Sequence, residues 1–174
     1  MSNAETFAAP INKFVAEMPE RQNAVYRDAI QMTVQAMTLP KARGGAMPVR
    51  DGFLRASTRA VIGAQPPLKT RRPKEGVAPA FDMGDITLVL SGATVEDTVT
   101  VAFTMVYAAR VNFGFVGQDS LGLTYNQAGA HFVELAAQKW PQIAAQSAMR
   151  LQNVVANKSA RPGMAALAAA EAGL

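Results

Sequence analysis

Residues 106–115 read VYAARVNFGF, and this stretch decides the expected fold. It follows an alternating run of β-branched residues and precedes a long amphipathic segment. Its aromatic side chains suit packing, and Gly114 and Gly117 permit a sharp bend of the backbone. We therefore interpret it as a strand end that turns a corner, with a structural corner formed by Tyr107, Phe113 and Gly114.

The segment before this corner predicts β structure. Apolar and polar residues alternate over 86–91 and again over 98–107, and a short polar stretch joins the two runs. This pattern is typical of an antiparallel hairpin spanning 86–107. We expect its inner face to meet the helix that contains Phe132, through Val101, Phe103 and Met105.

A further strand is predicted over 54–62, where apolar residues alternate with arginines. Arg55 and Arg59 then share one strand face, which is either exposed to solvent or lines an interface or channel. A helical start at residues 53–55 is the alternative.

Helices are predicted on both sides of these strands. Apolar residues recur at helical spacing over 5–18 and 20–38, so Pro19 leaves either one broken helix or two short ones. Residues 113–125 read as a glycine-bearing loop, and helix resumes near Asn126. Pro141 kinks this last helix or starts a second one at its first turn.

The expected fold class is therefore α+β. A small antiparallel sheet is packed by N-terminal helices and a long kinked C-terminal helix. One domain is expected over 1–157, with an extended basic loop at 63–85 and an Ala-rich tail at 158–174. Hydrophobic residues make up 49% of the chain, but many are alanine. Such a core is thin, and we expect partner subunits to complete it.

Positive charge is concentrated in one region. The net charge is +4, and nine of the 17 Lys and Arg residues lie between 41 and 74, where only Asp51 opposes them. The densest run holds Lys69, Arg71, Arg72 and Lys74. It is either a solvated loop or a contact for an acidic partner or nucleic acid. Because no aromatic residue is interleaved, nucleic-acid contact would be with phosphate and independent of sequence.

Little in the chain indicates catalysis. There is no cysteine and one histidine, which excludes thiol chemistry and multi-histidine metal sites. His131 has Glu134 three residues later, but no nucleophile motif accompanies the pair. Ser57 and Ser120 lack a Gly-x-Ser-x-Gly context. We expect no enzyme, and no catalytic, cofactor or metal site.

The chain also lacks targeting signals. No run approaches the roughly 18 apolar residues of a membrane span. The first residues have neither a basic start nor an apolar core, so no secretory signal is expected. We expect a soluble protein made inside the cell.

Three segments resemble one known family in their order and spacing. Residues 47–57, MPVRDGFLRAS, are similar to a Pro-Val-x-x-Gly-x-Leu-Arg-x-Ser pattern, and residues 107–114 to Tyr-Ala-x-x-Val-x-Phe-Gly. Residues 130–151 occupy the place of a closing helix. Together, over residues 20–157, they resemble the tail-completion or neck proteins that join head and tail in long-tailed bacteriophages. The chain departs from that family at Asn112, where an acidic residue is common, and at 123–127, where many members are Pro-rich.

The resemblance implies a structural virion protein, assembled in the host cytoplasm as a homo-oligomeric ring, commonly a hexamer, through which DNA passes. Its implied partners are the neighbouring head-closure and tail-terminator rings, with non-specific DNA contact. The candidates for the interface or the DNA-facing lumen are Arg55, Arg59, Lys69, Arg71, Arg72 and Lys74. The alternatives are a tail-terminator ring or a small sequence-independent nucleic-acid-binding module.

Overall fold

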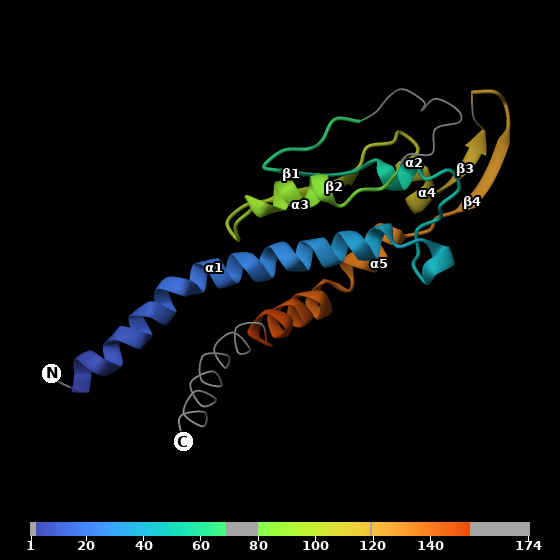
Figure 1. The fold of residues 1–174 in the computed structure, drawn as a ribbon. Coiled ribbons are helices and arrows are strands. Elements are labelled where there is room, and N and C mark those ends of the chain that lie inside the picture. The colour runs from blue at the N-terminus through green and yellow to red at the C-terminus, as the bar shows by residue number, and fades with distance from the viewer. Residues whose placement is uncertain (1–2, 69–79, 119, 154–174) are drawn as a thin grey trace, which may run out of the picture.

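The computed structural model describes residues 3–68, 80–118 and 120–153, with side chains from residue 12 onward. Its architecture is α+β (Figure 1). The long helix α1 (Asn3–Thr38) runs through the middle. The strands β1 and β2 and the helix α3 lie on one side of it, and the C-terminal helices lie on the other. The central part of the expected basic loop and the expected tail at 158–174 lie outside the described residues.

Helix α1 corrects the first expectation, because it is continuous through Pro10 and Pro19 instead of breaking at Pro19. A proline inside a helix removes one backbone hydrogen bond and bends the axis. The ribbon of α1 accordingly bends in its N-terminal half (Figure 1). The C-terminal half is held by the core, where Ile30, Val34 and Met37 are buried.

The first sheet pairs β1 (Thr58–Ile62) with β2 (Val99–Phe103), antiparallel and with Ala60 opposite Val101. The strand expected over 54–62 is therefore confirmed for its second half only. The first half is the short helix α2 (Phe53–Ala56), the alternative allowed by the sequence. The 3-10 helix η1 (Lys41–Arg43) precedes it.

The hairpin expected over 86–107 is wrong, because its first arm is the helix α3 (Gly84–Ser91). Ile86 and Leu90 are four residues apart and both buried, whereas Leu88 between them is 74% exposed. The apolar residues therefore follow the helical period, and packing outweighs the β propensity of the segment. At the N-terminal end, Asp82 Oδ1 accepts a hydrogen bond from the Gly84 amide at 2.8 Å.

The corner after β2 is a helical turn, α4 (Ala108–Phe113), and not the end of a strand. The expected loop over 113–125 is also wrong. A second two-stranded antiparallel sheet forms there, from β3 (Gly114–Gln118) and β4 (Thr124–Ala128). These strands delay the C-terminal helix from Asn126 to α5 (Phe132–Ala137).

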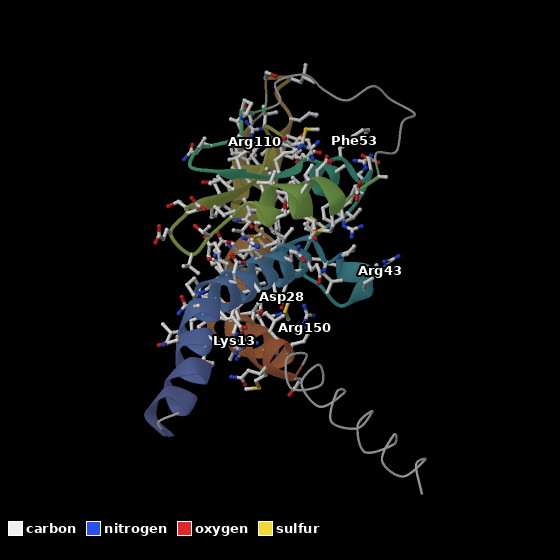
Figure 2. The ribbon with its side chains drawn as sticks, turned by 60° about the vertical axis from the view of Figure 1, so that its left-hand side comes forward. Lys13, Asp28, Arg43, Phe53, Arg110 and Arg150 are labelled. Atoms are coloured by element: carbon white, nitrogen blue, oxygen red, sulfur yellow. The ribbon has the colours of Figure 1, made fainter. Side chains whose placement is uncertain are left out.

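After α5 the chain is helical again over 140–153. Pro141 lies in the first turn of this second helix, which confirms one of the two expectations for it. Ser147 on this helix is fully buried, and its hydroxyl donates to Asp28 Oδ2 of α1 at 2.6 Å. Arg150 pairs with the other oxygen of the same carboxylate. Figure 2 shows Asp28 and Arg150 projecting toward each other.

The core has two clusters, which share α5. One joins α1, β1, α3 and Ala136, and the other joins Met47, Leu54, Met105 and Phe132. Phe103 of β2 meets Phe132 edge to face, with ring centroids 5.0 Å apart. The expectation that Phe103 and Met105 face the helix of Phe132 is thus confirmed. Val101 instead packs against the first cluster.

Candidate functional site

The two arginines proposed to share a strand face do not do so. Arg55 lies in α2, where its Nε donates to the Thr38 carbonyl at 2.9 Å and its guanidinium lies 4.4 Å from the centre of the Phe81 ring. Arg59 lies in β1, and its Nη1 donates to the carbonyls of Ala56 and Thr58. Both side chains therefore hold the fold together. The prediction of an arginine-bearing strand face is wrong, because the chain is helical at residue 55.

Other cations in the same region reach solvent. Lys41 and Arg43 of η1 are exposed, and the side chain of Arg50 is 94% exposed beside Asp51. Figure 2 shows Arg43 pointing outward from its loop. The basic residues Lys69, Arg71, Arg72 and Lys74 lie outside the described residues. Among the described cations between 41 and 74, Lys41, Arg43 and Arg50 are the ones placed to meet an external anion.

The corner segment is tied to the C-terminal helix by a buried asparagine. Asn112 is only 3% exposed, and its amide nitrogen donates to both carboxylate oxygens of Glu134 at 2.9 Å. Its side-chain oxygen accepts from the Val133 amide at 3.2 Å, at the start of α5. Its backbone carbonyl accepts from the His131 amide at 2.9 Å. These contacts give Asn112 and Glu134 a structural role that the sequence did not reveal.

Two glycines allow the corner to close. Gly114 has φ +89°, and a β-carbon there would lie 2.6 Å from the Gln127 carbonyl oxygen. At Gly129 a β-carbon would lie 2.5 Å from the Asn112 carbonyl oxygen. Only glycine permits both approaches. The structure thus confirms a bend at Gly114, although the expected partners Tyr107 and Phe113 are not buried there: Phe113 is 65% exposed.

The segments at 47–57, 107–114 and 130–151 meet around α4. A cavity of about 460 Å³ is lined by residues 48–55 together with Tyr107, Val111 and Gln127. Partial burial of the Tyr107 phenol raises its pKa, and the negative charge of Asp51 raises it further. On the other side of α4, Asn112 bonds to Glu134. The structure therefore brings together three segments that are distant in the sequence.

The β3–β4 sheet, which we call the arm (residues 114–128), carries apolar side chains into solvent. It projects from the end of the molecule where α4 lies (Figure 1). Val116 is 78% exposed, Leu121 is 79% exposed, and every residue of β4 is exposed. The arm was not predicted, because β4 has no buried face and so no alternation. The signal that could have revealed it is the spacing of Gly114, Gly117 and Gly122, which all have positive φ.

A second apolar feature lies at the other end of the molecule. A groove of about 1060 Å³ runs between the N-terminal half of α1 and the helix over 140–153. Its apolar walls include Phe14, Met18, Val25, Trp140 and Leu151. Trp140 is 38% exposed at the groove.

The described residues contain no group of three or more His, Cys, Asp or Glu side chains that could hold a metal ion. None of the helices in the described ranges is long and apolar enough to cross a membrane. Comparison with known proteins found no matching family model, no matching curated protein and no matching solved structure.

Proposed function

We propose that this chain is a structural phage virion protein at the head–tail junction, a tail-completion or neck ring through which DNA passes. It acts by assembling with copies of itself and with the neighbouring head-closure and tail-terminator rings. In this proposal it performs no chemical reaction.

The observation that carries the proposal is the exposed apolar arm. A soluble monomer seldom exposes contiguous apolar surface, and such surface marks contact with another protein. Phe113, Val116 and Leu121 lie on or beside the arm and are all at least 65% exposed. An isolated two-stranded hairpin is also marginally stable in water. Both facts are accounted for if another subunit covers the arm.

The meeting of three segments around α4 supports the same proposal. The segments at 47–57, 107–114 and 130–151 are the ones that resemble the neck family. Around α4 they form a rigid base for the arm, through the Asn112–Glu134 bonds and the contacts at Gly114 and Gly129. In a joint that must hold two large assemblies together, a rigid base keeps the contacting surface in position.

A ring that passes DNA needs cations that can meet phosphate. Arg55 and Arg59 are bonded to backbone carbonyls, so the proposal assigns this role to exposed Lys41, Arg43 and Arg50 instead. Such contacts are independent of sequence and weaken as salt rises.

The same exposed cations favour the second candidate, a small sequence-independent nucleic-acid-binding module. The two functions differ in what the purified protein does. A module binds DNA as a monomer, and the logarithm of its affinity falls linearly with the logarithm of the salt concentration. A neck protein assembles and has weak affinity for DNA as a monomer.

Deleting the gene from a phage that encodes this chain tests the proposal. We expect DNA-filled heads and finished tails that stay apart under the electron microscope, with joining restored by the chain supplied from a plasmid. Complete, infectious particles from the deletion phage would contradict a role at the head–tail junction.

A further inference from the structure

We draw no further inference here: the strongest candidate, the apolar groove between the N-terminal half of α1 and the helix over 140–153, carries none because nothing in the structure shows what covers it.

Discussion

The ring of Phe103 on β2 meets the ring of Phe132 on α5 edge to face, at 5.0 Å and an interplanar angle of 89°. This pair joins the sheet to the C-terminal helix across the second core cluster. Phe132 is 1% exposed, so the contact lies at the centre of the fold. Aromatic pairs in this geometry add about 0.5–1.5 kcal/mol to the free energy of burial.

Replacing Phe103 with alanine should therefore lower the free energy of unfolding by about 3 kcal/mol, the lower end of the range for core phenylalanines, because Phe103 is only partly buried. Phe113→Ala is the matched control, since that ring is 65% exposed. We expect it to change stability by less than about 0.5 kcal/mol. Urea denaturation measures both variants. Equal effects would show that Phe103 does not belong to the core.

Gly114 and Gly122 distinguish two reasons why a position requires glycine: a positive φ, and a close approach of the neighbouring backbone. Both have positive φ, +89° and +80°, but a β-carbon at Gly114 would strike the Gln127 carbonyl, whereas at Gly122 it would meet nothing within 4 Å. Gly122→Ala should lower the free energy of unfolding by about 1–2 kcal/mol through the backbone alone. Gly114→Ala should cost about 1–3 kcal/mol more, because the arm must move. Thermal denaturation that ranks the two variants in the reverse order would contradict the close approach at the corner.

Asp97 should make stability depend on pH in acid. Its Oδ2 accepts hydrogen bonds from the backbone amide and the hydroxyl of Thr94, both at 2.8 Å, and these bonds hold the pKa of the carboxyl below its ordinary value of 3.8. The folded protein then binds this proton less tightly than the unfolded chain does. The stabilisation is present above the ordinary pKa and is lost as pH falls through the lowered one.

Asp97→Asn should therefore be less stable than the wild type near neutral pH, and the difference should shrink below pH 3.8. Glu96→Gln is the control, because it removes the charge of the neighbouring exposed carboxylate. Denaturant titrations at a series of pH values measure both. A difference for Asp97→Asn that is unchanged between neutral and acidic pH would show that the carboxylate does not act through Thr94.

The arginines should divide into structural and exposed sets. Arg55→Glu with Arg59→Glu removes charge-assisted hydrogen bonds to three carbonyls and places carboxylates near them. Such bonds are worth roughly 1.5–3 kcal/mol each, so this pair should lower the free energy of unfolding by at least about 2 kcal/mol. Arg43→Glu with Arg50→Glu should change it by less than about 0.5 kcal/mol, because both side chains are exposed. Melting temperatures that fall equally in both double variants would contradict this division.

How far the sequence predicts the fold depends on where the buried faces lie. The strand at 99–103 was predictable from the alternation of Val99, Val101 and Phe103 with Thr100 and Ala102. Residues 86–90 fit both periods, since Ile86 and Leu90 satisfy a helix and Ile86, Leu88 and Leu90 satisfy a strand. Packing against α1 decides between the two. It joins residues far apart in the sequence, such as Gln31 and Thr87, whose side chains are hydrogen-bonded although they are 56 positions apart.

The candidate site was less predictable than the fold. The corner glycine was identified because Gly114 is a local signal. The arm was missed because β4 is exposed on all its residues, so no pattern marks it. Arg55 was misplaced because the single turn of α2 shifts it off the strand face. The bonds between Asn112 and Glu134 join residues 22 apart, and nothing local in the sequence indicates them.

Electron microscopy of the purified chain is the sharpest test of a neck ring. Two-dimensional class averages should show closed rings of a fixed number of copies, six being common in the family that the chain resembles. Their diameter should not change with protein concentration once assembly is complete. Class averages showing only single subunits at concentrations of tens of micromolar, together with salt-sensitive binding of DNA by the monomer, would contradict a neck ring and favour the nucleic-acid-binding module.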